Sequence, residues 1–159
     1  MVKNLINPIA EVAKLGFKVK YVPHEIIKDY NACYNVIYKG KNVKPPAADR
    51  LRIPLNEIWI SEKWRKYEKY ILYHELTEIK FRAQGYNVEE AHILAEMECI
   101  KLWRNNPQWR EFIVELHISD IENMAKEIKQ IKTNSKQYPQ IPSIKSSINH
   151  LNPQHYKYE

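Results

Sequence analysis

The chain contains little glycine and little cysteine. Three of its 159 residues are glycine, at positions 16, 40 and 85, which excludes a glycine-rich loop that cradles phosphates. The two cysteines, Cys33 and Cys99, are far apart and have no secretory context. This usage argues against a disulfide framework and against a four-cysteine zinc site. Any metal ligands are therefore expected to be histidines and carboxylates.

Long hydrophobic runs are also lacking. No apolar stretch approaches the roughly 20 residues that a membrane-spanning helix needs. Polar residues interrupt the first 17 positions, as they would not in a signal peptide. We therefore expect a soluble, cytoplasmic protein without membrane contact. The formal net charge of +6 and the pI near 9.2 are compatible with nucleic-acid binding through a basic surface, although lysines spread along the chain also suit an ordinary solvated surface.

Length and composition indicate one folded unit followed by a tail. The chain is 44% apolar, enough to fill one substantial core. Residues 1–133 are expected to form this single domain. Residues 134–159 contain three prolines, many Ser, Asn and Gln residues, and a small lysine excess, so they are expected to be a mobile basic C-terminal tail.

The hydrophobic pattern predicts a mixture of helices and strands. Period-two alternation or β-branched and aromatic residues predict strands at 17–22, 34–38 and 55–60. Helical periodicity and capping residues predict helices at 6–15, 62–84, 87–104, from 107 onward, and 119–133. The expected fold class is α+β, with a short antiparallel sheet packed against a mostly helical bundle.

The segment from Tyr73 to Glu78 carries the most informative residues. With about 100° per residue, the apolar side chains of helix 62–84 form one broad arc. Glu75 lies inside this arc, while His74 and Glu78 lie at its edge, four residues apart and on the same face. A carboxylate on an apolar face is costly unless it is paired or binds a metal.

The following helix supplies matching residues. If Gly85 is the pivot of an antiparallel helical hairpin, Glu78 precedes it by seven residues and His92 follows it by seven, so the two should lie at one level. His74 and Glu96 are each eleven residues from Gly85 and should form a second level. Four possible metal ligands therefore converge.

Two imidazoles and a carboxylate are a ligand set that suits Zn²⁺ or another divalent metal. His74, Glu78 and His92 would be the three protein ligands of a catalytic site. Glu96 would be a fourth ligand, or would orient a histidine from outside the coordination shell. Glu75 would be the catalytic base that accepts the proton of a metal-activated water.

A strand followed by a helix with His74-Glu75-Leu76-Thr77-Glu78 resembles the minimal core of zincin metallopeptidases, whose motif is His-Glu-x-x-His. The similarity covers residues 55–97 and departs at Glu78, where the family has a second histidine. The resemblance implies a zincin-like core, a peptide or protein substrate, and hydrolysis by a zinc-activated water. It also implies that strand residues 58–60 form the sheet edge that aligns the substrate.

Two alternatives remain open at the level of sequence. In the first, the same residues form a closed, non-catalytic metal site. In the second, the protein is a basic nucleic-acid-binding or protein-binding module of a virus or mobile element, and the buried His and Glu residues only form hydrogen bonds with one another.

Overall fold

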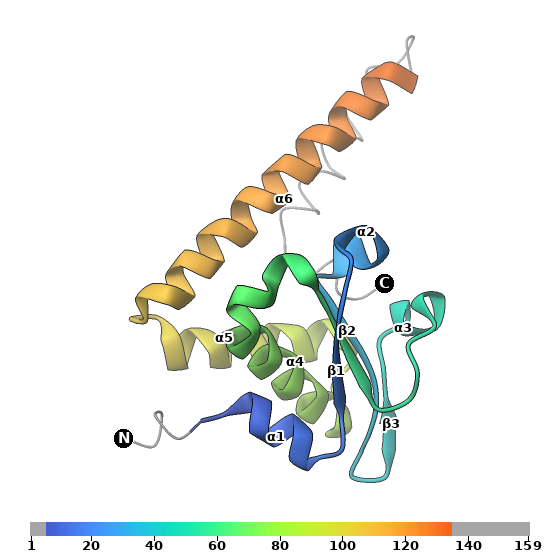
Figure 1. The fold of residues 1–159 in the computed structure, drawn as a ribbon, viewed down its shortest axis with the longest axis vertical. Coiled ribbons are helices and arrows are strands. Elements are labelled where there is room, and N and C mark those ends of the chain that lie inside the picture. Colours follow the sequence, from blue (N-terminus) through green and yellow to red (C-terminus); the bar gives the residue numbers. More distant parts are fainter. Residues whose placement is uncertain (1–5, 135–159) are drawn as a thin grey trace.

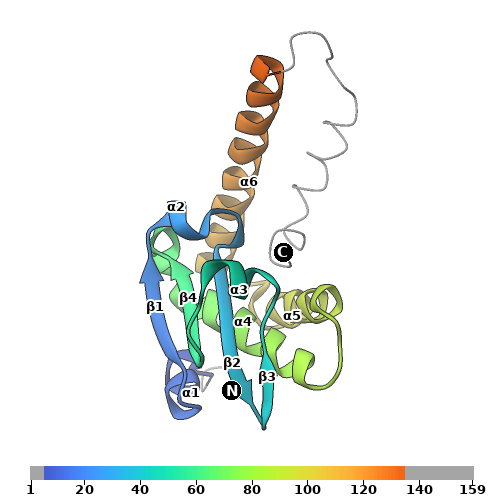
Figure 2. The same cartoon turned by 90° about the vertical axis from the view of Figure 1, so that its right-hand side faces the viewer.

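The computed structural model describes residues 6–134, which form a four-stranded sheet with helices on both faces (Figures 1 and 2). In chain order the elements are α1 (Pro8–Lys14), β1 (Lys18–Val22), α2 (His24–Ile27), η2 (Lys28–Tyr30), β2 (Ala32–Tyr38), β3 (Lys41–Val43), α3 (Ala47–Leu51), β4 (Glu57–Ser61), η3 (Glu62–Tyr67), α4 (Glu68–Ala83), α5 (Val88–Trp103) and α6 (Pro107–Asn134). No helix within these residues is long and apolar enough to span a membrane. The predicted tail lies outside the described residues, apart from its first position.

The strand order in the sheet is β1-β4-β2-β3. β4 pairs in parallel with β1 and antiparallel with β2, and β2 forms an antiparallel hairpin with β3. The predicted α+β class is confirmed. The sheet is mixed instead of antiparallel, because β4 pairs in parallel with β1, from which β2 and β3 separate it along the chain. Lys39 and Gly40 both have positive φ in the β2–β3 turn.

The sheet separates two cores of unequal size. On one face, inward side chains of β2 and β4 pack against α4; this larger core includes Tyr34, Val36, Ile58, Ile60, Leu72, Leu76 and Ile79. On the other face α2 and α3 cover a smaller core, which includes Val22, Ile27, Cys33, Ala47, Ala48 and Ile53. The sequence did not predict α2 and α3, because four or five residues are too few to show helical periodicity.

The ends of α4 and α5 agree with the capping signals of the sequence. Ser61 accepts a hydrogen bond from the backbone of Lys63, although the helical segment begins with 3₁₀ geometry and becomes α-helical only at Glu68. Gly85 has a φ of 109°, which favours glycine, and follows the end of α4. Asn87 and Glu90 form a capping box at the start of α5. These signals fix the hairpin that carries the candidate site.

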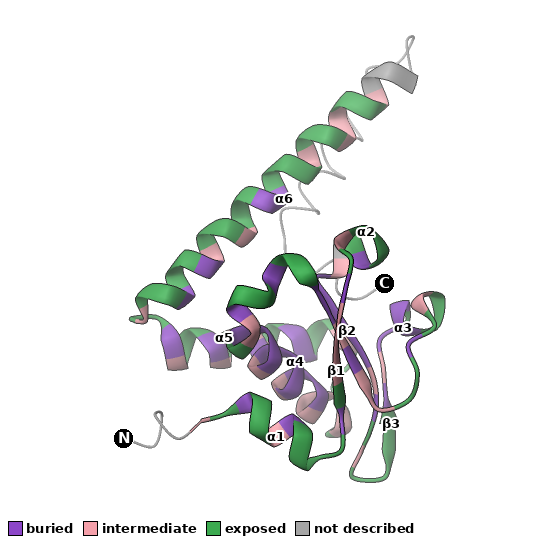
Figure 3. Ribbon diagram, in the orientation of Figure 1, coloured by how far each residue is buried: buried purple, intermediate pink, exposed green. Residues whose placement is uncertain are grey.

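The C-terminal helices predicted as two are one continuous helix. α6 runs from Pro107 to Asn134 without interruption at Ser119, where a separate helix was predicted to begin. Ser119 is instead buried, and its hydroxyl accepts a hydrogen bond from Lys63 Nζ at 2.7 Å. No proline or glycine lies between Pro107 and Asn134 to break the helix. The first half of α6 packs on the domain, and the second half projects away from it (Figures 1 and 3).

Candidate metal centre

The candidate centre lies between α4 and α5, which are antiparallel neighbours joined at Gly85. α4 contributes His74, Glu75 and Glu78, and α5 contributes His92 and Glu96. The two predicted levels are confirmed. At the level nearer the turn, Glu78 Oε1 lies 3.0 Å from His92 Nδ1. At the other level, Glu96 Oε1 lies 3.1 Å from His74 Nδ1.

Three possible ligand atoms form a triangle. His74 Nε2 lies 2.8 Å from His92 Nδ1 and 3.3 Å from Glu78 Oε1, and the third side is the 3.0 Å between Glu78 and His92. Ligands of tetrahedral zinc lie about 2.0–2.1 Å from the ion, so neighbouring ligand atoms are about 3.3–3.4 Å apart. The triangle needs to widen by only a few tenths of an ångström to match that spacing.

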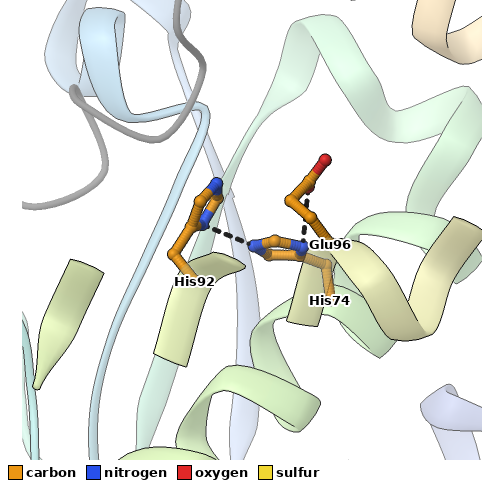
Figure 4. A group of neighbouring side chains, drawn as sticks. All are labelled: His74, His92 and Glu96. Atoms are coloured by element: carbon orange, nitrogen blue, oxygen red, sulfur yellow. Dashed lines mark hydrogen bonds and ion pairs between the residues drawn. The ribbon is translucent and has the colours of Figure 1, made fainter. Parts of the chain in front are cut away.

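Glu96 has a different position from the other three residues. Its carboxylate contacts His74 Nδ1, whereas His74 Nε2 faces His92 and Glu78. Figure 4 shows the His74 ring lying between His92 and Glu96. A metal-binding imidazole usually donates its second N–H to a carboxylate or carbonyl, which fixes the ring orientation. Of the two roles predicted for Glu96, this geometry matches the orienting one.

The centre is buried in the protein. The exposed fraction is 0% for His92, 1% for Glu75, 1% for Glu78 and 5% for His74. Burial opposes ionisation of Glu78, but the hydrogen bonds and charges of His74 and His92 outweigh it and hold its pKa well below the usual range. Glu78 is therefore a buried carboxylate that is negatively charged at neutral pH, as a metal ligand must be.

Tyr34 is a member of the centre that the sequence did not single out. Its hydroxyl donates a 2.7 Å hydrogen bond to Glu78 Oε2, the oxygen that does not face the histidines. Burial and the charges of Glu78 and Glu75 raise the Tyr34 pKa well above its usual value, so the hydroxyl keeps its proton and remains a donor. The alternation of strand 34–38 places Tyr34 on the inward face, but it gives no sign of which residue lies opposite.

Glu75 lies beside the triangle, as its position on the apolar arc predicted. Its Oε2 is 3.8 Å from His74 Nε2. The carboxylate is thus near the imidazole nitrogen that faces the other ligand atoms, and it comes from the same turn of α4. This position suits a group that exchanges a proton with a molecule bound next to the triangle.

A small cavity of about 30 Å³ adjoins the centre. His74, His92 and Glu96 line its polar side, and its other walls include Cys99 of α5 and four side chains of α6: Trp109, Phe112, Ile113 and Leu116. This space can hold at least one water molecule, because a water needs about 10–15 Å³ measured in this way. α6 therefore covers the space next to the histidines.

The predicted role of residues 58–60 as a sheet edge is wrong. β4 lies between β1 and β2, and its backbone pairs with both neighbours, so it cannot add a peptide strand. The sequence signal identified the strand before the motif helix correctly. It could not show that β1, which is distant along the chain, covers the side where a substrate would pair.

The fold and the centre thus define an α+β protein with a buried His/Glu cluster that can hold a divalent metal. Two overlapping groups have ligand atoms close enough to hold a metal ion, one formed by His74, His92 and Glu96 and the other by His74, Glu75 and Glu78, and the triangle of His74, Glu78 and His92 shares two members with each. Comparison of the chain with family models, curated proteins and solved structures gave no match. The function must therefore be argued from the centre itself.

Proposed function

We propose that the protein binds one divalent metal ion between α4 and α5. The ligands are His74 Nε2, Glu78 Oε1 and His92 Nδ1, and the observation that carries the proposal is the closeness of these three atoms, at 2.8–3.3 Å, inside the protein. Glu96 fixes the His74 ring, and Tyr34 fixes the Glu78 carboxylate. In known metal sites, too, residues outside the coordination shell form hydrogen bonds to the ligands and fix their orientation.

The ligand chemistry favours zinc among the common divalent metals. Imidazole nitrogen suits Zn²⁺, Fe²⁺, Ni²⁺ and Cu²⁺, whereas Mg²⁺ and Ca²⁺ prefer oxygen ligands. Three protein ligands leave one position of a tetrahedral ion for water or substrate. We therefore infer a zinc ion or a similar transition metal.

Cobalt substitution tests this proposal directly. Co²⁺ added to metal-free protein should give visible d–d absorption typical of four or five ligands, saturating at one equivalent. Glu78→Gln should abolish the spectrum, because the amide is a much weaker ligand than the carboxylate. Glu89→Gln, an exposed substitution on α5, is the matched control and should leave it unchanged. A wild-type spectrum identical to that of free Co²⁺ would contradict the proposal.

The position of Glu75 favours a second function, metal-dependent hydrolysis. In the zincin-like arrangement, a bound metal activates water and polarises the carbonyl that is attacked. Glu75 Oε2, which is 3.8 Å from His74 Nε2, would accept a proton from water and pass it to the leaving amine. The resemblance to zincins implies a peptide or protein substrate.

Burial of the centre sets a condition on this second function. Glu75 is 1% exposed, and α6 lines the cavity next to His74 and His92, so a substrate reaches the centre only if the structure around it opens. We propose metal binding as the function that the geometry supports best, and hydrolysis as a further activity that requires this opening.

A hydrolysis test separates the two functions. Zinc-loaded protein is incubated with fluorescently labelled casein, and the Glu75→Gln variant is compared with wild type at equal metal content. Loss of cleavage with full retention of metal would support Glu75 as the base. Cleavage that persists unchanged in Glu75→Gln would contradict this role.

A further inference from the structure

α6 has two apolar faces along its first half. One face packs on the domain, where Trp109 and Phe112 are buried and Ile113 and Leu116 are half-buried. On the opposite face, Val114, Ile118 and Ile121 have exposed fractions of 57%, 50% and 44%. A helix that packs on a single core has one apolar stripe, so the second stripe calls for a partner.

The exposed stripe has the spacing of a coiled coil. It continues through the exposed Ala125 to the half-buried Ile128, so that consecutive members are four, three, four and three residues apart. In heptad terms, Ile118 and Ala125 occupy a positions, and Val114, Ile121 and Ile128 occupy d positions. The seam from Val114 to Ile128 is about 21 Å long at 1.5 Å per residue. Its second half lies on the part of α6 that projects beyond the domain (Figure 2).

In the first two heptads, one flank of this stripe has basic side chains and the other has carboxylates. Arg110 and His117 occupy g positions on one side, and Glu115 and Glu122 occupy e positions on the other. All four residues are exposed. In a parallel two-stranded coil, each g residue faces the e residue five positions later in the partner. Arg110 would then face Glu115, and His117 would face Glu122, in both directions across the seam.

We propose that the exposed stripe of α6 binds the same stripe of a second copy of this chain, forming a parallel two-stranded coiled coil. The stripe lies opposite the domain-facing side of α6, so the two domains would flank the coil without competing for the seam. Ile118 at an a position is the β-branched residue that two-stranded coils favour. This self-association does not depend on the metal centre.

Sedimentation equilibrium of the full chain, from micromolar to near-millimolar concentration, tests the proposal. Wild type should sediment as a reversible dimer. Ile118→Lys together with Ile121→Lys should raise the dissociation constant at least tenfold, because both substitutions place lysine charges in the apolar interface between the two helices. Met97→Lys is the matched control: Met97 is 58% exposed on α5, outside the stripe, and its substitution should leave the dimer intact.

A charge exchange tests the parallel orientation. His117→Glu should weaken the dimer, because it places a carboxylate at position 117 against Glu122 of the partner subunit. Adding Glu122→Lys should restore the dimer by replacing this repulsion with an attractive pair. Failure of the double variant to recover would overturn the parallel arrangement. A wild type that is monomeric throughout, or a dimer that Met97→Lys disrupts and the Ile118/Ile121 variant does not, would overturn the proposed interface.

Discussion

Glu78 Oε1 and His92 Nδ1 lie 3.0 Å apart, although 14 residues and a complete helix reversal separate them along the chain. Their contact depends on the turn at Gly85 and on the capping box that starts α5. The centre is therefore a property of the helical hairpin as a whole, and changes in the turn, in the ligands or in the residues that orient them should affect metal binding differently.

Tyr34→Phe removes the hydroxyl that holds Glu78 Oε2. We expect metal affinity to fall about 10–100-fold, as is typical when an orienting partner is lost. The free energy of unfolding should fall by about 1–3 kcal/mol, because a buried carboxylate oxygen loses its hydrogen bond. Competition with a chromophoric chelator measures the first effect and urea denaturation the second.

Tyr21→Phe is the matched control for Tyr34→Phe, since it deletes the same atom from a buried hydroxyl that has no hydrogen-bond partner within the described residues. Its metal affinity should equal that of wild type. Equal losses of affinity in both variants would show that Tyr34 has no specific role.

Glu96→Ala removes the carboxylate on His74 Nδ1. If Glu96 only orients the ring, the variant should still bind one equivalent of metal, with an affinity reduced about 10–100-fold. If Glu96 is itself a ligand, the coordination number should change. X-ray absorption at the metal edge of wild type and variant measures this number. An altered first shell in Glu96→Ala would contradict the orienting role.

Gly85→Ala places a side chain at a φ of 109°. Nothing lies within 4 Å of the added Cβ, so the cost comes from the backbone alone and should be about 1–3 kcal/mol of stability. Metal affinity should fall as well, because relief of this strain shifts α5 against α4.

Gln84→Ala is the control for Gly85→Ala, because Gln84 is exposed and its backbone is right-handed, with φ of −81°. It should unfold at the same denaturant concentration as wild type. A Gly85→Ala protein with wild-type stability would show that the turn does not constrain the hairpin.

Local signals in the sequence accounted for the hairpin and for its four facing residues. Gly85, Asn87 and Glu90 are short-range determinants whose effect on backbone geometry does not depend on the rest of the fold. Once they define two antiparallel helices, equal distances from the turn place Glu78 opposite His92 and His74 opposite Glu96. The predicted proximity followed from counting residues.

The features that escaped prediction depend on contacts distant in sequence. Tyr34 reaches Glu78 because β2 lies against α4, and β4 is internal because it pairs with the distant β1 as well as with β2. Likewise Ser119 resembled an N-cap, but its hydroxyl is satisfied by Lys63 and the helix continues. In each case the role of the residue or strand depends on a contact with a segment that is distant in the sequence, and the local sequence does not predict that contact.

Elemental analysis of the purified protein tests the central claim most directly. The full chain is prepared with zinc in the growth medium, passed through a desalting column and measured by inductively coupled plasma mass spectrometry, beside His92→Ala. We predict one equivalent of transition metal per wild-type chain and much less in the variant. A folded wild-type protein that carries no metal, and takes up none when zinc is added, would contradict the account.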